Sequence, residues 1–145
     1  MQRRVLLKGA VALGASLASA ASEPSHRPPT SVRAEFSAPQ VSYKRDNQPA
    51  TFWGLKGSAS LKDKTLTLTV VNPHATEHRK AEIAVRGRSP SSVEATVLAS
   101  SDIHAHNTFD NPNAVSSTSQ RAAISGGLLR YVFAPASVTR LSIGL

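Results

Sequence analysis

The sequence contains no cysteine and few aromatic residues. Without cysteine, a chain of 145 residues has neither a disulfide framework nor a thiol nucleophile. Aromatic side chains make up 5% of the sequence, and the basic residues are scattered along the chain without an aromatic platform beside them. Binding of single-stranded nucleic acid is therefore not expected. No apolar run reaches the roughly 20 residues that a membrane span needs. A chain of this length is sufficient for one domain with a hydrophobic core.

Catalytic patterns are also missing. The sequence has no G-x-S-x-G, no phosphate-binding loop and no dinucleotide-binding glycine pattern. It has nine acidic residues, and none of them forms a recognisable acid/base pair. The chain is also shorter than the roughly 250 residues of a catalytic (β/α)₈ barrel. We assign no catalytic, metal-binding or cofactor-binding residue.

The N-terminal segment, residues 1–21, has the pattern of a signal peptide. A basic start precedes an apolar run and the small-residue site Ala18-Ser19-Ala20. The order Gln2-Arg3-Arg4-Val5-Leu6-Leu7-Lys8 resembles a twin-arginine signal. We expect export to the periplasm or the outside of the cell, with removal of the leader and no membrane anchor afterwards. Residues 22–31 are rich in proline and serine and predict a disordered tether.

The net charge is +8, but three of the 17 basic residues belong to the leader, which leaves 14 basic against 9 acidic residues. A surplus of this size favours solubility more than it indicates a nucleic-acid partner.

Residues 32–145 alternate apolar and polar side chains in short runs. In the run Thr65–Asn72, Leu66, Leu68 and Val70 face one side and threonines the other, as in a half-buried antiparallel strand. Turn residues separate the runs and no helical period follows the leader. The pattern predicts an all-β fold, an antiparallel β-sandwich of about eight strands. The expected strands lie at 32–36, 41–43, 57–61, 65–72, 81–85, 93–98, 128–133 and 139–145.

Residues 101–115 crowd histidine, asparagine, aspartate and proline into one loop. We expect a short extended piece at Ile103–His106, which would place His104 and His106 on one face. With Asp102 or Asp110, the two imidazoles would suit a metal. A zinc site, however, needs further ligands at characteristic spacing, so a structural role for both histidines is the alternative.

The rest of this loop predicts a fixed shape. Asn107, Asp110 and Asn111 are expected to bond neighbouring backbone groups. Pro112 fixes its own φ and biases Asn111 away from helix. Phe109 is expected to anchor the loop through apolar contact. The loop should therefore be ordered although it is not regular structure.

These residues resemble the C-terminal domain of the α-L-arabinofuranosidases of glycoside hydrolase family 51. The resemblance rests mainly on the loop, with weaker similarity in Thr67–Pro73 and Ala134–Leu141, and it covers residues 32–145. The residues that carry the loop motif are His104, His106, Asn107, Thr108, Phe109, Pro112 and Val115.

The resemblance implies an accessory domain that accompanies a (β/α)₈ catalytic barrel. The family's retaining enzymes hydrolyse terminal non-reducing α-L-arabinofuranosyl residues, as part of L-arabinose metabolism and arabinan or arabinoxylan degradation. Their two catalytic glutamates lie in the barrel, in an Asn-Glu and a Glu-Trp motif, and neither motif occurs in this sequence. The resemblance therefore implies a truncated chain that is inactive alone.

Three hypotheses follow. The first is the accessory β-sandwich of an exported arabinofuranosidase, separated from its barrel and exposing apolar groups near Trp53 and Phe109 that favour self-association. The second is a secreted carbohydrate-binding or protein-interaction module, in which Trp53, Tyr43 or Tyr131 stacks on sugar rings, although Phe52 and Leu55 beside Trp53 favour a place in the core. The third is an independent enzyme, which the missing acid/base pair disfavours.

Overall fold

The computed structural model describes residues 3–8 and 28–145, with side chains for the second range. The described residues form strands and loops, and none of them lies in a helix long and apolar enough to cross a membrane. The strands are β1 (Arg3–Lys8), β2 (Thr30–Glu35), β3 (Val41–Arg45), β4 (Gln48–Phe52), β5 (Lys56–Lys62), β6 (Thr65–Asn72), β7 (Arg79–Val85), β8 (Ser92–Ala99), β9 (Ser117–Gln120), β10 (Ala123–Ser125), β11 (Leu128–Phe133) and β12 (Ser137–Gly144).

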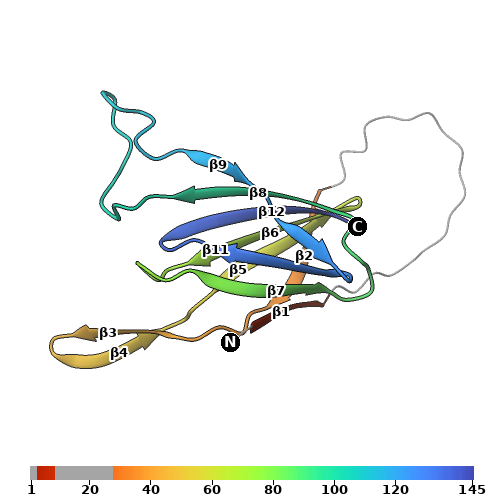
Figure 1. The fold of residues 1–145 in the computed structure, drawn as a ribbon, viewed down its shortest axis with the longest axis horizontal. Coiled ribbons are helices and arrows are strands. Elements are labelled where there is room, and N and C mark those ends of the chain that lie inside the picture. The colour runs from red at the N-terminus through yellow and green to blue at the C-terminus, as the bar shows by residue number, and fades with distance from the viewer. Residues whose placement is uncertain (1–2, 9–27) are drawn as a thin grey trace, which may run out of the picture.

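Two layers of strands pack face to face and share one strand. One layer has the order β10-β11-β7-β1, the other has the order β5-β6-β12-β8-β9, and β2 connects β1 to β5. The first half of β2, Thr30–Val32, pairs with β5, and the second half, Arg33–Glu35, pairs with β1. β2 therefore crosses from one layer to the other, as its course in Figure 1 shows. A strand that changes sheets in this way makes a corner of a sandwich.

The core lies between the layers and follows the predicted alternation. Leu66, Leu68 and Val70 of β6 are buried, whereas Thr67 and Thr69 between them are partly exposed. Leu129, Tyr131 and Phe133 of β11 alternate in the same way and face them across the sandwich. The prediction of an antiparallel β-sandwich is confirmed. The pairing of β1 with β7 is parallel.

Tight turns connect several neighbouring strands. Asp63 has a φ of 54° in the turn between β5 and β6, and the glycines at 126 and 127 have φ values of 58° and 75° before β11. Asp46 and Asn47 have φ values of 52° and 62°, which is the backbone of a two-residue type I′ hairpin. Residues Gln48–Phe52, which lie outside the strands expected from the sequence, therefore form strand β4 and pair with β3.

Four strands were not expected from the sequence. β4, β9 and β10 are short or polar and carry little alternation. β1 consists of residues assigned to the leader; the remainder of the predicted signal peptide lies outside the described residues, as does most of the tether. Thr30 and Ser31, which we placed in the tether, already belong to β2.

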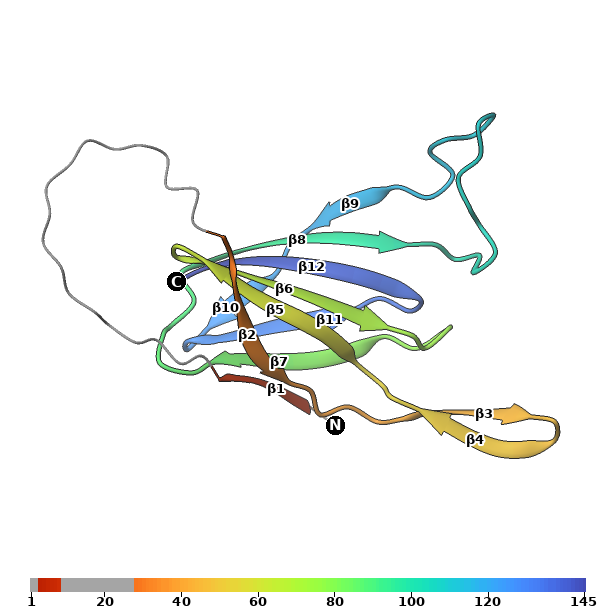
Figure 2. The ribbon, with the colours of Figure 1, turned by 180° about the vertical axis from the view of Figure 1, so that it is seen from behind.

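Two segments project from the same end of the sandwich. They are the β3–β4 hairpin and the loop between β8 and β9, which lie at the left in Figure 1 and at the right in Figure 2. The hairpin forms its own two-stranded sheet, separate from the sandwich.

Candidate functional site

The loop between β8 and β9, residues 100–116, begins with a turn. The Asp102 carboxylate accepts a hydrogen bond from the His104 backbone N–H at 2.8 Å, and the Asp102 carbonyl accepts one from the Ala105 N–H at 3.1 Å. The expected extended piece at Ile103–His106 is therefore wrong. An aspartate side chain that bonds the backbone two residues on competes with extended pairing, and here the turn prevails.

This turn removes the strand geometry on which a metal site at the two histidines depended. The His106 Nδ1 lies 2.9 Å from the His104 carbonyl oxygen, and both residues are exposed. Among the described residues, no group of three histidine, aspartate or glutamate side chains is arranged to hold a metal ion.

A pair of polar bonds closes the neck of the loop. The Asn107 side chain donates to the Val115 carbonyl at 3.0 Å and accepts from the Val115 N–H at 2.7 Å. Farther out, the Thr108 hydroxyl accepts from the Asn111 N–H at 3.0 Å. The expected bonding of Asn107 to the backbone is confirmed. The motif residues Asn107, Thr108 and Val115 therefore shape the loop, and Pro112 lies exposed within it.

Phe109 does not anchor the loop. Its side chain is fully exposed, at 106% of its reference area, so the expectation of an apolar anchor is wrong. The physical reason is that the bonds of Asn107 and Thr108 hold the loop without a buried ring. The phenyl group is thus presented to the outside.

Trp53 is likewise not a core residue. It is 42% exposed, whereas Leu55 two residues later is 3% exposed and packs in the core. Trp53 follows directly after the projecting β3–β4 hairpin, where no second layer covers it. Its ring contacts Phe52 at a centroid distance of 5.9 Å, and Phe52 contacts Tyr43 at 5.6 Å, both edge to face.

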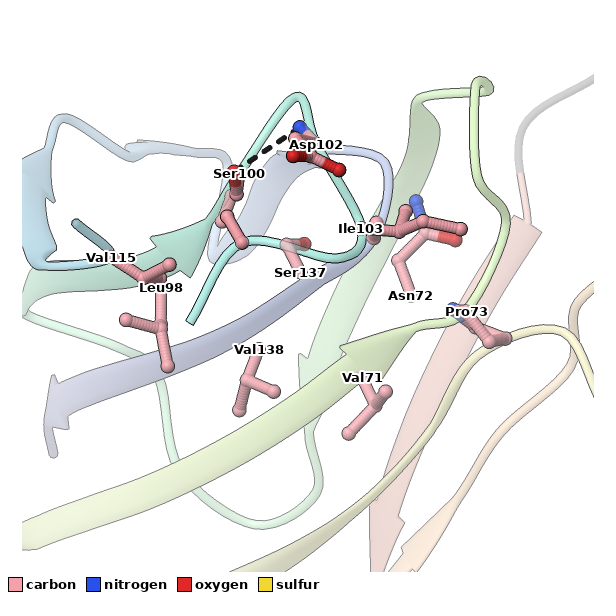
Figure 3. A pocket seen from close by; sticks show the side chains of 13 residues that line it. Val71, Asn72, Pro73, Leu98, Ser100, Asp102, Ile103, Val115, Ser137 and Val138 are labelled. Atoms are coloured by element: carbon pink, nitrogen blue, oxygen red, sulfur yellow. Dashed lines mark hydrogen bonds between the residues drawn. The ribbon is translucent and has the colours of Figure 1, made fainter. Parts of the chain in front are cut away.

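Three apolar side chains form a row across the outer face of the sheet at the base of the loop. Val138 of β12 is the register partner of both Val71 of β6 and Leu98 of β8. Figure 3 shows them side by side, with Ile103 and Val115 of the loop beside them. They line a hollow of about 290 Å³. Leu98 is 43% exposed and Val138 is 40% exposed.

The rest of that outer face is polar. The register row two residues along contains Thr69, Arg140 and Thr96, and the next contains Thr67, Ser142 and Glu94. We call the row of Val71, Leu98 and Val138, together with Phe109 and Trp53, the apolar end of the domain. It was only partly visible in the sequence, because register pairs residues that are far apart in the chain.

Asn72 holds the adjacent corner of the sandwich. It is 1% exposed, and its side-chain nitrogen donates to the carbonyls of Glu77, Phe133 and Ala134 at 2.9, 3.3 and 2.8 Å. Its side-chain oxygen accepts from the His74 N–H at 3.2 Å. This one amide therefore ties the end of β6 to the end of β11. The sequence showed only that a strand stops there.

A second hollow, of about 650 Å³, lies on the other layer and contains the most buried acid. Glu82 is 7% exposed and pairs with Arg130 at 3.2 Å. Nearby, the Tyr131 hydroxyl donates to Gln120 at 3.0 Å, and burial raises the pKa of Tyr131. Glu82 is the only carboxylate among the described residues lining the hollow, whereas retaining glycosidases need two, about 5 Å apart.

Comparison with solved structures gives the same fold in family 51 arabinofuranosidases. The enzyme from Xanthomonas axonopodis pv. citri superposes with a TM-score of 0.68 and 22% identity over 79% of this chain and 23% of its own. The enzyme from Thermotoga maritima gives 0.65 and 23% over 79% and 26%. The Bifidobacterium longum enzyme gives 0.66 and 17% over 78% and 22%. At these sequence identities, the structural similarity shows that this chain shares the fold of the superposed part of these enzymes.

The chain spans about a quarter of the length of these enzymes. No curated protein matches the sequence significantly. The sequence model of the α-L-arabinofuranosidase C-terminal domain matches residues 10–137, which is most of the chain. The protein therefore belongs to the α-L-arabinofuranosidase C-terminal domain family.

Proposed function

We propose that this chain is the accessory β-sandwich of an exported α-L-arabinofuranosidase and that it is not itself catalytic. In this proposal the apolar end docks on a (β/α)₈ barrel that hydrolyses terminal non-reducing α-L-arabinofuranosyl residues. The leader at residues 1–21 would direct the protein to the periplasm or the outside of the cell.

One observation supports docking above the others. The core between the two layers is complete, since Leu68, Phe133 and Leu141 have no exposed area. Yet Phe109 is exposed on the projecting loop between β8 and β9, and Trp53 is exposed directly after the projecting β3–β4 hairpin. Burying a large apolar side chain contributes about 1.5–3 kcal/mol, so a partner that covers both residues and the adjacent row gains substantially. A protein surface suits such a scattered, non-planar set.

The second candidate function is a secreted carbohydrate-binding module. The aromatic cluster of the exposed Tyr43 and Trp53 with the half-buried Phe52 favours it, because aromatic faces stack on sugars. The ring planes, however, meet at 69° and 89°, so the cluster does not present one flat platform. We therefore rank binding to arabinan or arabinoxylan behind docking to a protein.

Two assays on the purified chain test the proposal. We expect no release of arabinose from an aryl α-L-arabinofuranoside, because Glu82 is already paired with Arg130 and has no second carboxylate in its hollow. We also expect no retardation in an arabinoxylan affinity gel. Turnover that disappears in Glu82→Gln would contradict the first expectation. Retardation that disappears in Trp53→Ser but persists in Phe109→Ser would favour the sugar-binding module.

A further inference from the structure

Strand β1 occupies a gap between two strands that do not otherwise meet. Its residues Arg3 to Leu7 run parallel to β7 and pair with Ala81 to Val85. Its residues Leu6 to Lys8 run antiparallel to β2 and pair with Arg33 to Glu35. Figure 2 shows β1 beside β7 at the lower edge of the sandwich. The segment is thus bonded on both sides.

The position of β1 in the sheet order makes it a necessary link. Arg33–Glu35, the second half of β2, has β1 as its strand partner, and β7 has β1 on the side away from β11. If β1 is taken away, two strand edges face each other across about 10 Å, twice the ordinary spacing of neighbouring strands. Ile83 on β7 is fully buried, so this open edge would border the core. Unpaired edges of this kind bind extended peptides.

The same six residues form the charged start of the proposed leader. A leader that is cut from the domain near Ala20 would carry β1 with it, and the fold would lose the link between its layers. Residues 3–8 thus have two roles: they belong to the proposed export signal, and they form a strand of the folded domain.

We propose that the gap between β7 and β2 is a binding site for an extended strand, and that its occupant is the chain's own Arg3–Lys8 segment, which stays bound after the leader is cut. This inference rests on the export leader of the proposed function, but it does not depend on a barrel or a sugar. It also means that the folded domain and the export machinery compete for Arg3 and Arg4, since one segment cannot be paired in a sheet and bound by a receptor at once.

A cross-link in the intact chain tests whether β1 lies in this gap. The chain has no native cysteine, so Leu7→Cys with Ala34→Cys places two thiols at register partners. We expect nearly complete disulfide formation on mild oxidation. The matched control, Leu7→Cys with Arg33→Cys, is one residue out of register and should cross-link at least about tenfold less, because a one-residue shift turns the side chain to the opposite face. Equal cross-linking of the two pairs would overturn the proposal.

A cleavable chain tests retention of the segment. With a protease site inserted between Ala21 and Ser22, the folded chain is cut and passed through gel filtration. We expect the leader fragment to co-elute with the domain. A labelled peptide of residues 2–9 should exchange into the gap, the Val5→Ile peptide should bind similarly, and the Val5→Pro peptide should bind at least about tenfold more weakly, because proline cannot donate to the ladder. A fragment that separates at once, leaving a domain with unchanged melting temperature and no affinity for the peptide, would refute the inference.

Discussion

The inside of the sandwich and its apolar end use apolar side chains in opposite ways. Inside, Leu68, Phe133 and Leu141 are completely buried and depend on one another. At the apolar end, Phe109 and Trp53 are exposed on segments that are shaped by polar bonds and backbone turns. The difference indicates that the buried core stabilises the fold without Phe109 and Trp53, which leaves these two side chains available for the contact with a partner that we propose.

The largest effect should come from the core. Phe133→Ala removes a fully buried ring that packs on Tyr131 at 4.9 Å, and we expect a loss of about 3–5 kcal/mol in unfolding free energy. The adjacent Val132 is 44% exposed, so Val132→Ala should cost less than about 1 kcal/mol. Urea unfolding followed by circular dichroism measures both. Similar losses of unfolding free energy in Phe133→Ala and Val132→Ala would contradict the distinction between the buried core and the exposed face of β11.

Asn72 lies at a corner between the core and the apolar end. Substitutions of Asn72 should therefore lower the unfolding free energy by an intermediate amount. Asn72→Ala removes the side-chain donor to the buried Phe133 carbonyl and one of the two side-chain donors to the Ala134 carbonyl, which keeps its bond from the Ser137 hydroxyl; the loss costs about 1–3 kcal/mol. Asn72→Asp keeps the shape and the acceptor oxygen but loses the donor, so it should be destabilised to at least the same degree. A fully stable Asn72→Asp protein at neutral pH would show that the amide donor does not hold this corner.

Substitutions at the neck of the loop should affect local hydrogen bonding more than the global unfolding free energy. Asn107→Ala removes both bonds to Val115, but the residue is exposed, so we expect less than about 1 kcal/mol of change in global stability. Hydrogen exchange at the Val115 N–H should nevertheless accelerate. Asn113→Ala, in the same loop, serves as the control and should leave that exchange rate unchanged. A large drop in melting temperature for Asn107→Ala would mean that the loop belongs to the core unit.

Sequence reasoning succeeded where the determining interactions are local. The alternation of Leu66, Leu68 and Val70 predicted strand β6 correctly, and the expected runs 57–61 and 65–72 are separated by the turn at Asp63. It failed where register or distant packing decides. The exposure of Trp53 depends on a hairpin that stands away from the second layer, and the corner role of Asn72 depends on carbonyls 61 and 62 residues away in the chain.

The pairing of β1 could not be predicted for the same reason. Its residues match an export signal and contain no alternation, and only their register with β7 and β2 identifies them as a strand of the domain. In the loop, the bonding of Asn107 to nearby backbone was predicted correctly because it depends on local residues, whereas the turn at Ile103 and the exposure of Phe109 were misjudged.

Sedimentation velocity over a range of concentrations tests the role of the apolar end most directly. The change Trp53→Ser with Phe109→Ser should leave unfolding free energy almost unaltered, because neither ring is buried, but it should change association. We predict that the unaltered chain self-associates as its concentration rises, because the proposed docking surface exposes Phe109 and Trp53, and that the double variant remains monomeric. An unaltered chain that is monomeric at every concentration and is retarded in an arabinoxylan gel would contradict the account.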